Sequence, residues 1–174
     1  MRMRNVYIGF GSNLGDREGT INSAIKALEG ELVEMRSIKS LTQSNIYETE
    51  AWGMPESTPS FLNCVVCVET NLELLPLLEV LLKIEIDFGR ERNEGEDYSS
   101  RTLDLDILCS ENEIVNSNKL QVPHPRIRSR RFVLQPLNDL DPNLQIPYTE
   151  GNVSELLANC PLNPEVKPWL ATHT

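Results

Sequence analysis

Residues 101–107 read Arg-Thr-Leu-Asp-Leu-Asp-Ile, and the strict alternation from Leu103 onward is typical of a β-strand. Because successive side chains of a strand point to opposite faces, the three apolar residues are expected on one face. Asp104 and Asp106 are expected together on the other face, about 6.5–7 Å apart at their Cα atoms. The stretch therefore predicts a strand with an apolar face toward the core and an acidic face.

Two interpretations of the acidic face stay open at this point. A pair of carboxylates at i and i+2 can bind hard divalent cations, and a two-metal centre needs its ions about 3.5–4 Å apart. Oxygen ligands without a neighbouring histidine favour magnesium over zinc. The alternative is an acidic sheet face that is simply solvated.

The chain on either side of this strand has the patterning of a mixed fold. The expected strands are 6–10, 32–47, 61–70, 103–109 and a short one around 114–115. The expected helices are one from the N-cap Asp16 to Gly30, one over 74–88, and short ones over 125–134 and 153–157. Residues 48–60 and 89–100 are expected to be loops.

The order strand, helix, strand, strand, helix, strand is the split βαβ pattern. It predicts an α+β fold, a ferredoxin-like antiparallel sheet with packed helices and a C-terminal extension. The length of 174 residues suits one domain, which we place at residues 1–160, followed by a proline-rich, irregular tail over 161–174.

Composition narrows the function classes. The net charge is −10, with 16 basic and 26 acidic residues, which argues against a nucleic-acid surface. No apolar run approaches the ~20 residues of a membrane span, and the start lacks the apolar region of a signal peptide. We expect a cytoplasmic protein with no membrane partner and no obligate protein partner.

Arginine is concentrated in two places in this acidic chain. Five basic residues and no acid occur from Lys119 to Arg131, and Arg90, Arg92 and Arg101 form a second group. The guanidinium fork matches phosphate, so these groups predict an anion site. A basic helix face paired with surface carboxylates is the alternative. The arginine-rich loop 89–100 is interpreted as a closing lid or as an ordinary surface loop.

The four cysteines are not expected to bind metal. Cys64 and Cys67 form a C-x-x-C within an expected strand, where residues three apart point to opposite faces. Reduced, structural thiols are expected.

Three phosphate-binding interpretations compete. The turn at residues 9–15 follows a strand and precedes a helix, but its glycines fall as G-x-G-x-x-x-G rather than the Rossmann G-x-G-x-x-G. No Walker A motif occurs. Paired aspartates with flanking arginines and the distal His124 make the third and most coherent interpretation.

These residues resemble the 6-hydroxymethyl-7,8-dihydropterin pyrophosphokinase family of folate biosynthesis, from about Val6 to about Cys160. The motifs that carry the resemblance are Gly11-Ser12-Asn13-Leu14-Gly15, Phe61-Leu62-Asn63, Gly89-Arg90-x-Arg92, Arg101 to Ile107, Val122-Pro123-His124 and Arg130-x-Phe132-Val133-Leu134-x-Pro136-Leu137. The Arg101 to Ile107 string with the spaced Pro-His is the specific part.

The resemblance implies a magnesium-dependent kinase that transfers pyrophosphate from ATP to the hydroxymethyl group of the pterin and releases AMP. It implies that Asp104 and Asp106 hold two Mg²⁺ ions and that Arg92 and Arg101 act with them in catalysis. The residues implied to bind ATP are Glu85, Arg90, Arg92, Arg101, Ile107, Lys119, Gln121, His124 and Arg130. Those implied to bind the pterin are Thr49, Trp52, Phe61, Asn63, Tyr98 and Phe132.

The chain departs from the family pattern in places. Asp97, Tyr98 and Ser100 stand where the family usually has an arginine, a tryptophan and a proline. Leu82 stands at a position where a polar contact to the nucleotide is found. The other functions considered are a ferredoxin-like module that binds pterin without catalysis and, more distantly, a nucleotide-dependent oxidoreductase. The intact arginine, aspartate and histidine set argues against the first, and the irregular glycine turn against the second.

Overall fold

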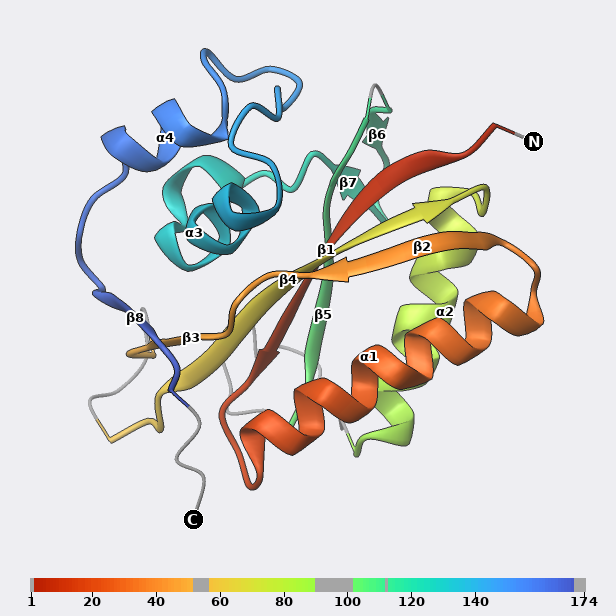
Figure 1. Ribbon diagram of the computed structural model, residues 1–174, viewed down its shortest axis with the longest axis horizontal. Helices are drawn as coiled ribbons and strands as arrows, with labels where there is room; N and C mark the ends of the chain where they lie inside the picture. The colour runs from red at the N-terminus through yellow and green to blue at the C-terminus, as the bar shows by residue number, and fades with distance from the viewer. Residues whose placement is uncertain (1, 52–56, 90–101, 112, 171–174) are drawn as a thin grey trace.

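The computed structural model describes residues 2–51, 57–89, 102–111 and 113–170, and it contains an antiparallel sheet built around one central strand. Strand β1 (Arg4–Ser12) pairs with β4 (Phe61–Thr70) on one side and with β5 (Asp104–Ser110) on the other. The expected strands at 6–10, 61–70 and 103–109 are thus present to within two residues at each end. The sheet lies diagonally across the molecule in Figure 1.

The other edge of the sheet is made of shorter strands. β2 (Ile38–Gln43) and β3 (Tyr47–Thr49) pair with different halves of β4, and β8 (Val166–Pro168) pairs with β3. The strand order is β5-β1-β4-β3-β8, with β2 also on β4. Every one of these pairings is antiparallel, which confirms the expected mixture of helices with an antiparallel sheet.

The single strand expected over 32–47 is wrong. Leu32 belongs to a helix, and the strand breaks at Ser44. There the Ser44 backbone N–H donates to the Val65 carbonyl at 2.9 Å, while the Ser44 hydroxyl accepts from the Val65 N–H at 3.0 Å. The side chain thus takes over a backbone role, and two strands form instead of one.

Two helices cover one face of the sheet. α1 (Arg17–Glu34) begins where expected, since the Asp16 side chain accepts the Gly19 N–H at 3.0 Å. α2 (Leu74–Asp87) tolerates Pro76 in its first turn. Both helices bury apolar stripes against strand residues such as Ile8 and Phe10 in the larger core cluster, and they lie together on one side of the sheet (Figure 1).

Gly30 does not end α1, contrary to the expectation from the sequence. The helix continues to Glu34, because Leu32 is fully buried in the core and Gly30 lies on the exposed side. A glycine in a helix interior costs only about 1 kcal/mol relative to alanine, which this burial offsets.

The opposite face is covered by the C-terminal helices. The single helix expected over 125–134 is wrong: a 3-10 turn, η1 (Ile127–Ser129), is followed by α3 (Arg131–Leu140). Arg130 is extended between them, and α3 runs past Pro136 because Val133, Leu134 and Leu137 are buried. α4 (Val153–Asn159) begins at an Asn152 capping box and packs on α3.

Two further segments complete the fold. The short strand expected around 114–115 is β6 (Val115–Asn116), which pairs with β7 (Gln121–Val122) in a separate hairpin. The tail is not wholly irregular as expected, because β8 extends the main sheet. The division of the chain at residue 160 stays a prediction. Among the described helices, none combines the length and apolar character needed to cross a membrane.

Candidate active site

The acidic face of β5 is formed as the alternation predicted. Leu103, Leu105 and Ile107 are at most 4% exposed and belong to the larger core cluster. Asp104 and Asp106 are partly exposed, and the Asp106 side chain is 42% exposed. Their carboxylates therefore lie on the other face of the sheet, at its surface.

Glycines of β1 lie directly opposite both aspartates. Gly11 pairs with Asp104 and Gly9 with Asp106, and on the far side of β1 Gly11 pairs with Asn63. A Cβ on Gly11 would lie 3.2 Å from Asn63 Oδ1 and 3.8 Å from both Asp104 Cβ and Phe61 Cδ1. The row Asn63, Gly11, Asp104 thus has no side chain in its middle.

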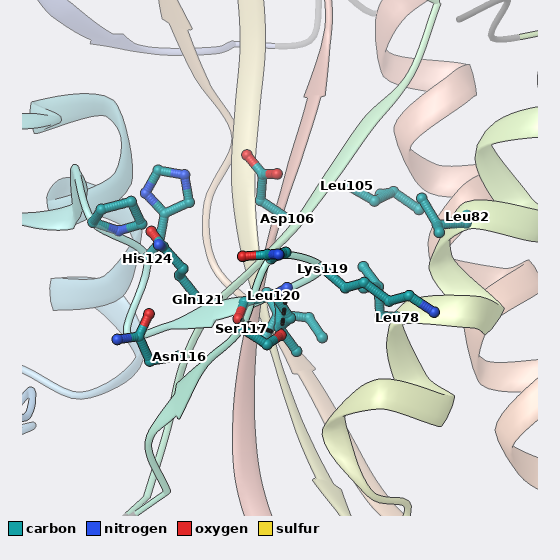
Figure 2. Close-up of a pocket in the computed structure, with 13 residues that line it drawn as sticks. Leu78, Leu82, Leu105, Asp106, Asn116, Ser117, Lys119, Leu120, Gln121 and His124 are labelled. Atoms are coloured by element: carbon teal, nitrogen blue, oxygen red, sulfur yellow. Dashed lines mark hydrogen bonds between the residues drawn. The ribbon is translucent and has the colours of Figure 1, made fainter.

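A cavity of about 670 Å³ opens beside Asp106. Figure 2 shows Leu78 and Leu82 of α2 on one side and His124 on the opposite side, with Asp106 between them. The described residues that line the cavity are Leu78, Leu82, Leu105, Asp106, Ile107, Asn116, Ser117, Asn118, Lys119, Leu120, Gln121, His124 and Pro125. A cavity with one apolar wall and polar groups opposite it suits a ligand that has a flat apolar ring and a charged chain.

His124 is held neutral with a defined proton position. Burial, followed by the positive charge of Arg130, lowers its pKa to about 4, against the opposing effect of Asp104. Its Nδ1 accepts the Arg126 backbone N–H at 3.1 Å. The remaining ring proton of the neutral imidazole is therefore on Nε2, which makes that atom a hydrogen-bond donor.

Arg130 connects the cavity side of the site with Phe132. Its Nη1 lies 3.9 Å from Asp106 Oδ2, and its side chain is 14% exposed. The guanidinium carbon is 5.7 Å from the centre of the Phe132 ring. Arg130, between η1 and α3, thus brings a cation to the acidic face of β5, and Phe132 in the first turn of α3 places an aromatic ring next to it.

Glu85 lies behind β5 rather than at the surface. It is 1% exposed, and its Oε1 accepts the Leu105 backbone N–H at 2.8 Å. This bond ties α2 to the strand between the two aspartates. A contact of Glu85 with ATP, implied by the resemblance, stays a prediction.

Three of the residues expected to bind the pterin, Thr49, Phe61 and Asn63, lie close together at the end of β3 and the start of β4. Thr49 and Asn63 are 3% and 9% exposed, and Asn63 Nδ2 donates to Thr49 Oγ1 at 2.8 Å. Phe61 is partly buried near Gly11. Phe132 packs, partly buried, against a second core cluster, which includes Val65, Leu108 and Val133. Thr49, Phe61 and Asn63 thus lie across Gly11 from Asp104, whereas Phe132 belongs to α3.

Five of the predicted site residues lie outside the described residues. They are Trp52, Arg90, Arg92, Tyr98 and Arg101. Their roles in binding or catalysis stay predictions.

Sequence reasoning missed part of the site. Gly9 and Gly11 were considered only as part of a phosphate-binding turn, although they pair directly with the two aspartates. Leu78 was not expected at the site, yet Leu78 and Leu82 are both partly exposed and line the cavity. The leucines of α2 cover a wider part of the helix surface than a helix needs to face the core. This width indicated that some of them have another role.

Comparisons with known proteins identify the family. A model of the family described as 7,8-dihydro-6-hydroxymethylpterin-pyrophosphokinase (HPPK) matches residues 7–142. A 2-amino-4-hydroxy-6-hydroxymethyldihydropteridine pyrophosphokinase of Pseudomonas aeruginosa is 39% identical, covering 91% of this chain and 93% of its own. The protein of that name from Aquifex aeolicus is 36% identical, covering 93% and 96%.

Solved structures agree on the fold. A crystal structure of HPPK-DHPS in complex with substrates has a TM-score of 0.66 at 16% identity, covering 90% of this chain. Plasmodium falciparum HPPK-DHPS with pteroate has a TM-score of 0.67, also at 16% identity and 90% coverage. This chain spans 43% and 42% of those two chains.

The chain belongs to the 7,8-dihydro-6-hydroxymethylpterin-pyrophosphokinase family. It is therefore a transferase, a pyrophosphokinase, and the acidic face of β5 with the adjoining cavity is its candidate active site.

Proposed function

We propose that Asp104 and Asp106 hold Mg²⁺ for the reaction of this family and that the transfer takes place over the acidic face of β5. The protein transfers the pyrophosphoryl group of ATP to 6-hydroxymethyl-7,8-dihydropterin in folate biosynthesis. The hydroxymethyl oxygen forms a bond to the β-phosphorus, while the bond from the β-phosphorus to the oxygen that bridges it to the α-phosphorus breaks. AMP leaves, and the hydroxyl proton is lost.

The position of the two aspartates supports this proposal most directly. They lie between the cavity lined by His124 and the group formed by Thr49, Phe61 and Asn63. A reaction of this kind depends mainly on positioning and charge neutralisation, since the protein supplies little covalent chemistry. Two substrates bound on either side would meet above the aspartates.

The donor set of the site fits magnesium. Asp104 and Asp106 offer carboxylate oxygens on one face of one strand. Within the described ranges, no three His, Cys, Asp or Glu side chains come together as a ready-made metal site. Mg²⁺ suits this arrangement, because it keeps several waters and takes phosphate oxygens as ligands beside one or two carboxylates. Two bound ions would neutralise charge on the transferred phosphates.

The other side chains divide between the two substrates. On the ATP side, the Nε2–H of His124 donates to a nucleotide oxygen, Arg130 adds positive charge, and Ile107, Lys119 and Gln121 line the cavity. On the pterin side, Asn63 recognises the amide-like edge of the ring, and Phe61 and Phe132 stack on its faces. Thr49 orients Asn63. Arg92 and Arg101 bind phosphate oxygens, Arg90 and Glu85 assist on the ATP side, and Trp52 and Tyr98 contribute to pterin binding.

The direct test mixes the protein with ATP, Mg²⁺ and the hydroxymethyl pterin and separates the nucleotides by chromatography. We expect AMP in equal amount to the pyrophosphorylated pterin, and no AMP when EDTA replaces Mg²⁺. Formation of ADP would mean that a single phosphoryl group is transferred. AMP formation in EDTA would contradict the role of magnesium.

The variant Asp106→Asn keeps the shape of the side chain and removes its charge. We expect kcat to fall on the order of 10²–10³, the scale for losing one well-placed group that stabilises transition-state charge. Circular dichroism checks that the fold is kept. Glu29→Gln, an exposed position on α1, removes the same charge far from the site and should retain wild-type kcat. An Asp106→Asn protein as active as Glu29→Gln would exclude Asp106 as a metal ligand.

Three further expectations are part of the proposal. The ferredoxin-like arrangement of the sheet, a cytoplasmic location and the absence of an obligate protein partner all stay predictions.

A further inference from the structure

The C-terminal segment contacts the sheet at the strand that carries Thr49. β8 pairs with β3 over its whole length, with Val166 opposite Thr49 and Pro168 opposite Tyr47. The next residue, Trp169, donates its backbone N–H to the Ile46 carbonyl at 2.9 Å. β8 lies along β3 at the edge of the sheet in Figure 1. The family match ends at residue 142, so this segment lies beyond the part of the chain that the family model covers.

Two residues at the start of α1 hold the Trp169 side chain, one at its indole N–H and the other at the face of its ring. Its Nε1–H donates to Glu18 Oε2 at 2.9 Å, and the Arg17 guanidinium carbon lies 5.1 Å from the centre of its ring. The indole also packs partly buried against the larger core cluster. The ring is therefore a wedge between α1 and the edge of the sheet.

Arg17 connects this wedge to both strands of the pterin side. Its Nη1 donates to Glu48 Oε1 of β3 and to the Ser60 carbonyl, both at 2.8 Å. Glu48 immediately precedes Thr49, and Ser60 immediately precedes Phe61. We call Arg17, Glu18, Glu48 and Trp169 the edge clamp.

β3 needs such a clamp, because it is three residues long. Its Tyr47 end is held on α3, where the Tyr47 hydroxyl donates to the Asp139 carboxylate at 2.9 Å. Its Thr49 end is held by β4, by β8 and by the edge clamp. Thr49 in turn accepts the Asn63 amide, so the position of β3 determines how Asn63 is oriented.

We infer that Trp169 is a positioning residue for the pterin half of the active site. Through Arg17 and β8 it holds Thr49 against Asn63, and so sets the affinity for the pterin without contacting it. This inference rests on the proposed function of Thr49 and Asn63. Replacing Trp169 should not change the affinity for ATP. The described residues that line the cavity come from α2, β5, the β6-β7 hairpin and the segment after it.

The test measures two Michaelis constants for each variant, one for the pterin at saturating ATP and one for ATP at saturating pterin. For Trp169→Ala we expect the pterin KM to rise about fivefold to tenfold, the loss expected when one hydrogen bond is no longer well placed. The ATP KM should stay within about twofold and kcat within about threefold. Trp169→Phe keeps a ring beneath Arg17 and should restore most of the pterin affinity.

Leu170→Ala is the matched control, because Leu170 is the next residue and is 81% exposed. It should leave both constants at the wild-type value. Arg17→Gln keeps Trp169 and removes its link to β3 and Ser60, so it should reproduce the rise in the pterin KM. If Trp169→Ala does not fold, Arg17→Gln decides the inference.

Two results would overturn the inference. The first is an equal rise of both Michaelis constants, which indicates general loosening. The second is a pterin KM that is unchanged in Trp169→Ala, or in Arg17→Gln where the former does not fold. The proposed function fails separately, if the wild-type protein produces no AMP in the same assay.

Discussion

The burial of His124 makes the free energy of unfolding depend on pH. Its pKa falls from 6.5 to about 4 on folding, mainly because burial disfavours the charged imidazole. Between these two values the unfolded chain binds a proton that the folded protein does not, so lowering the pH favours unfolding. Above pH 6.5 both states carry neutral His124, and this stabilising contribution is fully present.

We therefore expect the free energy of unfolding of the metal-free protein to fall more steeply from pH 6.5 to 4 than that of His124→Gln. The difference in slope is at most about 1.4 kcal/mol per pH unit, the value for one proton. Urea unfolding at a series of pH values measures both slopes. Identical slopes would show that His124 is not protected from protonation by the fold.

α1 shows how packing decides the length of a helix. The apolar spacing and the Asp16 cap predicted its start correctly, but Gly30 was taken for its end. The exposed backbone at Gly30 leaves a Cβ free of any neighbour within 4 Å. Gly15 is equally open, but its φ of 63° is one that alanine adopts only with strain.

This contrast gives a paired prediction. Gly30→Ala should stabilise the protein by about 0.5–1 kcal/mol, because alanine loses less backbone entropy in a helix. Gly15→Ala should destabilise it by about 1 kcal/mol, although both sites have room for a methyl group. Thermal unfolding of the two variants measures the signs. A lower Tm for Gly30→Ala would mean that the helix is locally distorted there.

The layers of the molecule are joined by a few polar contacts as well as by the core. Tyr47 of β3 is 6% exposed and donates to Asp139 of α3, which also accepts the Asn45 side chain at 3.1 Å. Burial, and then the hydrogen bond with Asp139, raise the pKa of Tyr47. This contact ties the edge of the sheet to the helix layer that carries Phe132.

Removing the hydroxyl in Tyr47→Phe should cost about 1–2 kcal/mol in the free energy of unfolding, because the acceptor is charged but lies near solvent. A double-mutant cycle with Asp139→Ala should give a coupling energy of about 1 kcal/mol. Urea unfolding of the two single variants and the double variant supplies the values. Additive effects would show that the two side chains do not interact.

The parts of the fold that local pattern could predict are those with uninterrupted periodicity. The strand at 61–70 and the helix at 74–88 agree with β4 and α2 to within a residue. The break at Ser44 and the start of α3 at Arg131 depend on partners far away in sequence, namely Val65 and the second core cluster. Local pattern carries no information about those partners.

For the site, alternation in residues 103–107 was enough to place both aspartates on one face, because side chains of a strand alternate whatever surrounds it. The match of motifs was enough to indicate the family. How Gly9 and Gly11 come to lie beside those aspartates, and how Trp169 reaches the strand of Thr49, follows from sheet register and from a pairing between residues 47 and 168. Strand pairing joins segments without regard to their distance along the chain. Short stretches of sequence thus determine which chemical groups the site contains, while the shape of the site depends on which strands lie next to one another.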